Sequence, residues 1–240
     1  MKQLSKAKSW RWIYNLLAFF SIVGCTSNAE SHQSINHTPE LTDEQQYFLR
    51  ISLEGELSGV PPVVKKWNQN INIFVVDTTY SELMDELDQI VDEINDLSAT
   101  VTLRRAKTRV ESNYLIYFGN AQTYATDYEP AAASLVERET NKGAFWIYWD
   151  GNYRIIRGSM YVNTEREQLL NCQKHTLREE ITQSLGLMQD TDDFPTSIFY
   201  QSRSCGTQYA DIDKQLIRWQ LSEEIKAGMN RSDIVALWNP

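Results

Sequence analysis

The chain has 240 residues, a length that favours one main domain with short appendages. It carries 23 lysine and arginine residues against 32 aspartate and glutamate residues, so its formal net charge is -9 at pH 7. Such a surface repels the phosphate backbone of nucleic acids and anionic lipid headgroups. We therefore expect no nucleic-acid partner, and any attachment to a membrane must come from an anchor rather than from the protein surface.

The N-terminal segment has the layout of a secretory signal peptide. It opens with four basic side chains, at Lys2, Lys6, Lys8 and Arg11. The apolar stretch at 13–23 is far shorter than the roughly 20 apolar residues of a membrane-spanning helix. It ends in SIVGC, which resembles a bacterial lipobox. We expect residues 1–24 to be a lipoprotein signal peptide and Cys25 to be lipidated after cleavage. An uncleaved signal anchor with a chance cysteine is the alternative.

The expected lipid on Cys25 also predicts where the protein is located. Acyl chains such as palmitate hold a protein on a membrane because each buried CH₂ contributes about 0.8 kcal/mol. This signal type predicts a lipid-anchored protein of the bacterial cell envelope that faces the periplasm. Thr26 in place of aspartate favours the outer membrane, by analogy with bacterial lipoproteins. The polar residues 25–41 predict a flexible tether. The lipid membrane is thus one expected partner.

Two further cysteines, Cys172 and Cys205, remain once Cys25 carries lipid. Two thiols in an oxidising periplasm are expected to form a disulfide. This disulfide would close a loop of about 30 residues and stabilise the fold by roughly 3–4 kcal/mol, if it acts by restricting the unfolded chain. Two separate buried thiols are the alternative.

Residues 42–240 carry the periodic patterns of one folded domain. Thr42 is placed to cap a first helix. The further elements expected are strands at 70–77, 100–105 and 113–119, a helix at 81–97, and a hairpin at 145–164 that turns at Asp150-Gly151. The pattern predicts an α/β (α+β) fold.

The C-terminal third is expected to be mainly helical. Thr164 and Glu167 have the spacing of a capping box that opens a helix, and Gly186 can end this helix in a left-handed conformation. A helical region at 209–229 and a short helix at 232–238, capped by Ser232, follow. We expect these last segments to form a small helical C-terminal part.

The segment HTLREEITQSLGLMQD, residues 175–190, is similar to the zinc-binding motif H-E-x-x-H-x-x-G-x-x-H of the metzincin peptidases. Glu180 and Gly186 occupy the positions of the motif's glutamate and glycine. The three histidine positions hold Glu179, Gln183 and Gln189. The segment therefore keeps the structural part of the motif and lacks its histidines.

Several stretches, in order along the chain, resemble the domain-of-unknown-function family 2927, whose members are often lipoproteins. They are YFLRISLEGE, VVKKWNQNINIFV, REEITQSLGLMQD, SIFY and IKAGM. This family looks like a divergent branch of the metzincin-related, zincin-like peptidases. The resemblance covers about 45–238 and implies a zincin-like fold, a twisted mixed sheet with the motif helix packed against it.

A catalytic zinc site needs three protein ligands and one open position for water. His32 and His37 lie in the tether, so His175 is the one histidine of the folded domain. Gln183 offers a neutral amide, which binds zinc poorly. We therefore expect no cofactor. The alternative is zinc bound by ligands among Glu179, Gln183 and His175, or by a cluster of Cys172, His175 and Glu179, with Glu180 as the catalytic base.

The faces of the motif helix suggest roles for its polar residues. At about 100° per residue, the apolar stripe runs along Leu170, Leu177, Ile181 and Leu185. Glu180 and Gln183 border this stripe. His175 falls beside Arg178 and Thr182, on the side expected to meet solvent.

Two accounts of Glu180 and Gln183 remain open. In one they hydrogen-bond to neighbouring backbone and replace the metal as a structural link. In the other they line a cleft with Trp146 and Tyr148 of the aromatic hairpin, where a bound chain could add to the hairpin as a strand. We expect a non-catalytic, degenerate peptidase domain that binds a protein, a peptide or an envelope component. A noncanonical zinc metallopeptidase with Glu180 as general base and a purely structural lipoprotein are the alternatives.

Overall fold

The computed structural model describes residues 40–54, 59–133, 141–202 and 204–239. The expected signal peptide, Cys25, His32, His37 and nearly all of the tether lie outside these residues. No helix in the described part of the chain is long and apolar enough to cross a membrane.

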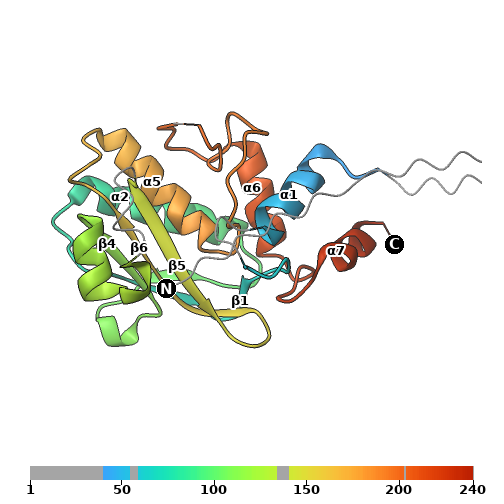
Figure 1. Cartoon of the computed structure of the whole chain (residues 1–240), viewed down its shortest axis with the longest axis horizontal. Helices are drawn as coiled ribbons and strands as arrows, with labels where there is room; N and C mark the ends of the chain where they lie inside the picture. The colour runs from blue at the N-terminus through green and yellow to red at the C-terminus, as the bar shows by residue number, and fades with distance from the viewer. Residues whose placement is uncertain (1–39, 55–58, 134–140, 203, 240) are drawn as a thin grey trace, which may run out of the picture. The chain divides into compact units, whose positions relative to one another are not determined.

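The described residues form a mixed α/β structure, which confirms the predicted fold class (Figure 1). Its strands are β1 (Lys66–Trp67), β2 (Ile71–Val75), β3 (Leu103–Arg105), β4 (Tyr114–Phe118), β5 (Gly143–Trp149) and β6 (Arg154–Val162). Its main helices are α1 (Asp43–Leu53), α2 (Ser81–Leu97), α5 (Leu170–Gln183), α6 (Asp211–Gln220) and α7 (Arg231–Trp238). Short turns of helix are η1 (Arg109–Glu111), α3 (Ala121–Thr123), η2 (Tyr124–Tyr128) and η3 (Pro130–Ala132).

The sheet is parallel apart from one strand. Strands β3, β2, β4 and β6 lie in this order with parallel pairing, and β1 pairs with the first residues of β6. Strand β5 runs antiparallel to β6 and forms the predicted hairpin with it, through a turn that begins at Asp150. Among the described strands, β5 pairs with β6 alone. Strand β5 is therefore an edge strand of the described sheet.

Helices α2, α5 and α6 pack on one face of the sheet and enclose the main hydrophobic core. Alternate residues of a strand point to opposite faces. Ile147 and Met160 accordingly belong to this core. Tyr161 lies on the other face, where it stacks on Tyr124 of η2.

The motif helix α5 begins later than predicted, at Leu170 rather than Thr164. Glu167 does not act in a capping box. Its carboxylate forms an ion pair with Lys142 and accepts the backbone N–H of Leu169. The ion pair with Lys142 therefore takes the carboxylate that the capping-box pattern of Thr164 and Glu167 would have used. In the same way, the cap of α7 is Asn230 rather than Ser232.

Gly186 follows the end of α5 with φ of +111°, which agrees with the predicted left-handed position. The space around it is also restricted. A Cβ atom on Gly186 would lie 2.0 Å from the backbone oxygen of Lys65. Glycine at this position therefore lets α5 end directly against the segment that leads into β1.

Candidate functional site

A cavity of about 600 Å³ lies between β5, α5 and the segment 188–205. Its residues come from regions far apart in the sequence, so packing of the hairpin against the motif helix creates it. Glu180, Gln183 and Trp146 line it, and so do Glu179 and Asp190. We call this cavity the α5–β5 cleft.

The close approach of the two walls depends on Gly143, the first residue of β5. A Cβ atom on Gly143 would lie 2.3 Å from Cγ2 of Thr176 and 3.1 Å from Oε1 of Glu180. Any larger residue at this position must push the strand away from α5. The start of β5 therefore runs directly along the polar face of the motif helix.

The backbone of β5 is arranged for pairing on both sides. The carbonyl oxygen of Lys142 accepts a hydrogen bond from the N–H of Asn163 at 2.7 Å. Hydrogen-bonded pairs alternate along an antiparallel ladder, so the N–H and C=O groups of Gly143, Phe145 and Ile147 point away from β6. All three residues line the α5–β5 cleft.

Tyr148, predicted to line the cleft, does not line it; this prediction is wrong. Its hydroxyl donates a hydrogen bond to Oε1 of Glu129 at 2.5 Å, and the guanidinium of Arg157 stacks 3.5 Å from its ring centroid. Trp146 lines the cleft, but it also packs against the tyrosines on the far face of the sheet. The reason is the alternation of the strand, which turns these two side chains away from α5.

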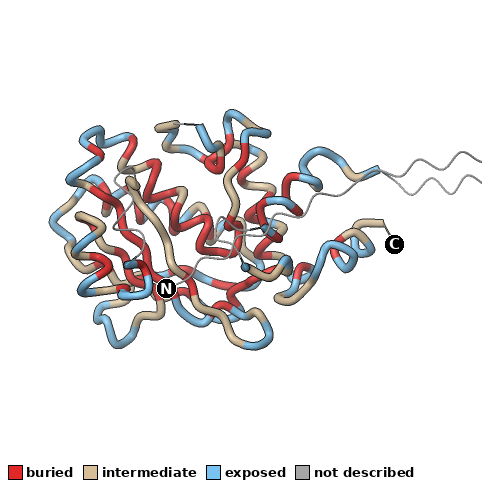
Figure 2. The backbone as a smooth tube through the Cα atoms, viewed as in Figure 1, coloured by how far each residue is buried: buried red, intermediate tan, exposed pale blue. Residues whose placement is uncertain are grey.

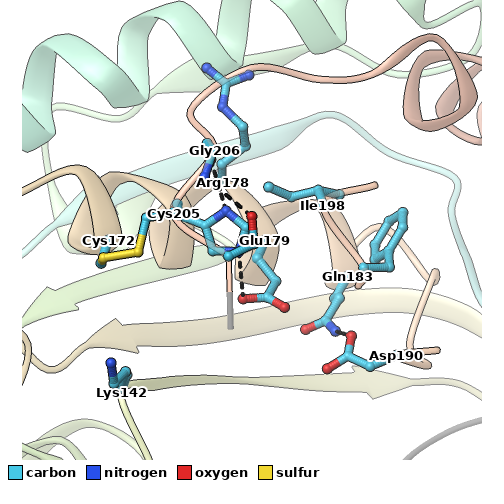
Figure 3. A network of polar contacts seen from close by, with 12 residues as sticks. Lys142, Cys172, Arg178, Glu179, Gln183, Asp190, Ile198, Cys205 and Gly206 are labelled. Atoms are coloured by element: carbon cyan, nitrogen blue, oxygen red, sulfur yellow. Dashed lines mark hydrogen bonds and ion pairs between the residues drawn. A yellow bond between two sulfur atoms is a disulfide. The ribbon is translucent and has the colours of Figure 1, made fainter. Parts of the chain in front are cut away.

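On the α5 side of the cleft, Gln183 is buried and its amide nitrogen donates to Oδ1 of Asp190 at 2.6 Å. Figure 3 shows these two side chains directed at each other. Glu180 is also buried. Burial and, to a smaller extent, the charge of Glu180 raise the pKa of Tyr161 to about 12. Gln183 thus bonds to a side chain rather than to the backbone, and both Glu180 and Gln183 also line the cavity.

The predicted disulfide between Cys172 and Cys205 is present, with Cα atoms 4.4 Å apart. Both cysteines line the cleft. Figure 3 shows the bridge between them. Because the bridge engages the thiol of Cys172, this residue is not available as a metal ligand. The disulfide fixes the segment around Cys205 to the first turn of α5.

His175 is buried, so the expectation that it meets solvent is wrong. Its Nδ1 lies 2.8 Å from the carbonyl oxygen of Gly206, and its Nε2 lies 3.7 Å from Oε2 of Glu179. Burial lowers the pKa of His175, and the positive charge of Arg178 lowers it further. The hydrogen bond to Gly206 raises this pKa and so offsets part of the shift. The segment that carries the disulfide covers a side of α5 which the sequence pattern left open.

The sequence pattern also missed the buried ion pairs of Arg178. This arginine is fully buried, and its guanidinium donates to Glu86 at 2.6 Å and to Glu93 at 2.7 Å, both on α2. It also stacks on the ring of Tyr209 at 4.5 Å. Glu86 and Glu93 are seven residues apart on one helix, so they share a face. This acidic spacing was a readable signal for a basic partner.

The described residues do not fit a catalytic zinc ion, which needs three protein ligands. Among them, no three histidine, cysteine, aspartate or glutamate side chains are grouped as metal ligands. Gln183 uses its amide nitrogen on Asp190, and His175 uses Nδ1 on Gly206. These side chains are therefore engaged in hydrogen bonds within the protein rather than arranged around a metal position.

A sequence model of the family described as "Protein of unknown function (DUF2927)" matches residues 42–239. The chain belongs to this family, since the match covers most of its length. The resemblance to this family inferred from the sequence is thereby confirmed, while its relation to the metzincin peptidases stays a prediction. No curated protein matches the chain.

Proposed function

We propose that this DUF2927 protein is a lipid-anchored protein of the bacterial cell envelope, with a degenerate zincin-like domain that binds an extended polypeptide without cleaving it. The bound polypeptide would lie in the α5–β5 cleft. The observation that carries this proposal is the outward-pointing backbone of β5 along the cleft wall. The partner is a segment of another protein or of a peptide-containing envelope component.

An edge strand offers a row of hydrogen-bond donors and acceptors that an extended chain can satisfy. Gly143, Phe145 and Ile147 present such groups over five residues of β5. The cleft beside them has a volume of about 600 Å³, which is within the usual range for ligand pockets. Main-chain pairing would supply affinity, and the cleft would select a side chain.

Binding without cleavage fits the state of the motif residues. Peptide hydrolysis by a metallopeptidase depends on a metal that lowers the pKa of water from 15.7 to about 7. Gln183 and Gln189 stand at two of the motif's histidine positions. Gln183 and His175 already form hydrogen bonds, with Asp190 and Gly206. Because these groups are engaged within the protein, they are poorly placed to serve as metal ligands.

The lipid anchor is proposed from the signal-like segment and from Cys25. It is tested separately from binding. Cells fed a palmitate analogue should incorporate it into the full chain and not into a Cys25→Ser variant. The variant should leave the membrane fraction. Equal labelling of the two proteins contradicts the anchor.

Strand addition is tested with peptides selected from a random phage-displayed library on the purified protein. A selected peptide is then N-methylated at one residue at a time. Antiparallel or parallel addition to β5 predicts that methylation weakens binding at alternate peptide residues, because only every second N–H faces the partner strand.

A variant of the protein tests the same proposal. Gly143→Ala should weaken peptide binding, since its Cβ would meet Thr176. Gly151→Ala is the matched control, with nothing within 4 Å of an added Cβ. Methylation effects without a two-residue period contradict the proposal.

A noncanonical zinc metallopeptidase is the second candidate. It is favoured by the position of Glu180, which lines the cleft beside the first residue of β5, where a bound chain would pass. Metal analysis of the purified protein separates the two candidates. One tightly bound zinc per chain, together with a peptidase activity that Glu180→Gln abolishes, would show that the protein is a metallopeptidase. This result would contradict the proposal of binding without cleavage.

A further inference from the structure

A second cavity, of about 420 Å³, lies at β1, the turn of the β5–β6 hairpin and the segment after α6. We call it the β1 cavity. Its lining shares no residue with that of the α5–β5 cleft. It includes Lys66 and Asn68 from the β1 region, Asn152 and Arg154 from the hairpin, and Lys226 from the segment after α6.

Lys66 is an unusual residue to line a cavity, because its side chain is only 6% exposed. Its ammonium group donates to the backbone oxygens of Ser222 and, at 2.6 Å, Ile225. Among the described residues it forms no ion pair with a carboxylate within 4.0 Å. Buried charges in proteins are normally paired, since removal from water is costly. Lys66 therefore has no carboxylate at ion-pair distance in the described part of the fold, and the charge of Glu224 acts on it only from farther away.

The other charged groups of the β1 cavity are also mostly positive. Arg154 and Lys226 line it, against the single carboxylate of Glu223. Arg154 is already paired with Asp150, at 2.7 Å, so Lys66 and Lys226 stand against Glu223 and leave one positive charge in excess. This cavity has the opposite character to the whole chain, whose net charge is -9.

We propose that the β1 cavity binds a small oxyanion, through a phosphate or carboxylate group, with Lys66 as its counter-ion and Lys226 at its entrance. The amides of Asn68 and Asn152 add further donors to the lining. Lysine ammonium groups suit oxyanions as compact charges with three donors each. Burial lowers the pKa of Lys66 to about 8, and Glu224 opposes this. A bound anion would stabilise the charged form that burial disfavours.

Isothermal titration of the full chain with inorganic phosphate, at constant ionic strength in chloride, tests the site. Acetate is the carboxylate probe. We expect one site per chain for at least one of the two anions. Affinity should fall about tenfold in Lys226→Gln, the loss of one charge-assisted contact, and below detection in Lys66→Met. Lys107→Gln is the control, since Lys107 is exposed and does not line the cavity.

Two results would overturn the proposal. One is that neither phosphate nor acetate binds above the chloride background. The other is that Lys226→Gln keeps wild-type affinity, and this result decides the question if Lys66→Met fails to fold. Peptide binding at the α5–β5 cleft uses other residues, so it can succeed or fail independently of this site.

Discussion

The motif helix α5 has two polar faces, and both are buried. Figure 2 accordingly colours most of this helix as buried. One face carries Thr176, Glu180 and Gln183 and lines the α5–β5 cleft. The other carries Arg178 and Thr182 and packs against α2 and Tyr209. The first borders a cavity of about 600 Å³, and the second is fully buried and does not line that cavity. Polar residues on one helix thus serve two purposes, a ligand-accessible wall and a set of internal ion pairs.

The two faces of α5 separate polar residues that stabilise the fold from polar residues that can contact a ligand. Arg178 and Thr182 are fully enclosed, and each makes at least two polar contacts with the protein. Replacing them should mainly change stability. Replacing residues of the cleft face should mainly change binding.

Replacement of Arg178 by methionine should be the most destabilising of these changes. It would leave Glu86 buried without its closest cationic partner, Arg178, at a cost of about 3–5 kcal/mol. Urea denaturation measures the free energy of unfolding. Arg50→Met is the matched control, because its pair with Asp193 is exposed and worth less than about 1 kcal/mol. Equal losses in the two variants would contradict the assignment of Arg178 as a structural residue.

Loss of the disulfide should affect the cleft side of α5 more than the α2 side. The double change Cys172→Ser and Cys205→Ser removes a link across 33 residues, worth about 3–4 kcal/mol by loop entropy. Hydrogen exchange should rise in the described residues between 189 and 206 and stay low in α2. A uniform rise in exchange would show that the disulfide stabilises the whole fold and not the cleft wall in particular.

Two threonines on α5 allow an isosteric comparison of its faces. The hydroxyl of Thr182 donates to the backbone oxygen of Arg178 at 2.6 Å and lies 2.7 Å from the hydroxyl of Tyr209. Thr182→Val should therefore cost about 1–3 kcal/mol. Thr176 lines the cleft, and its hydroxyl makes no side-chain hydrogen bond within the described structure. Thr176→Val should change stability by less than about 0.5 kcal/mol. Similar costs for the two would remove the distinction between the faces.

Local patterns predicted the elements whose signals are local. Thr42 caps α1 through the side-chain contacts of a capping box, and α2 occupies 81–97 as its helical periodicity indicated. The hairpin turns at the predicted dipeptide. The capping-box pattern at Thr164 failed because Glu167 pairs with Lys142, a contact that depends on tertiary packing.

The site was predicted in part, for a similar reason. The motif resemblance placed Glu180 and Gln183 on one face of a helix, and both line the cleft. A helical projection cannot show what covers each face, so it gave His175 and Arg178 to solvent. Strand alternation predicts that Tyr148 and Phe145 point to opposite faces of the sheet. It does not predict which of the two faces is covered by α5. The burial of His175 and Arg178 and the orientation of β5 both depend on tertiary contacts, which local sequence patterns do not contain.

His175 lies between the two faces and should show a small pH effect. Its pKa is lowered in the folded state, so the unfolded chain binds more protons below its ordinary pKa of about 6.5. The associated stability is complete above this pH and is lost as the pH falls through the lowered value. The free energy of unfolding should therefore decrease between pH 7 and pH 5 through the protonation of this residue in the unfolded chain. His175→Gln keeps a donor for Gly206 but cannot be protonated, so its decrease should be smaller. Urea denaturation across this range measures the difference. Identical pH profiles would mean that His175 has the same pKa in both states and that the covering segment does not exclude solvent from it.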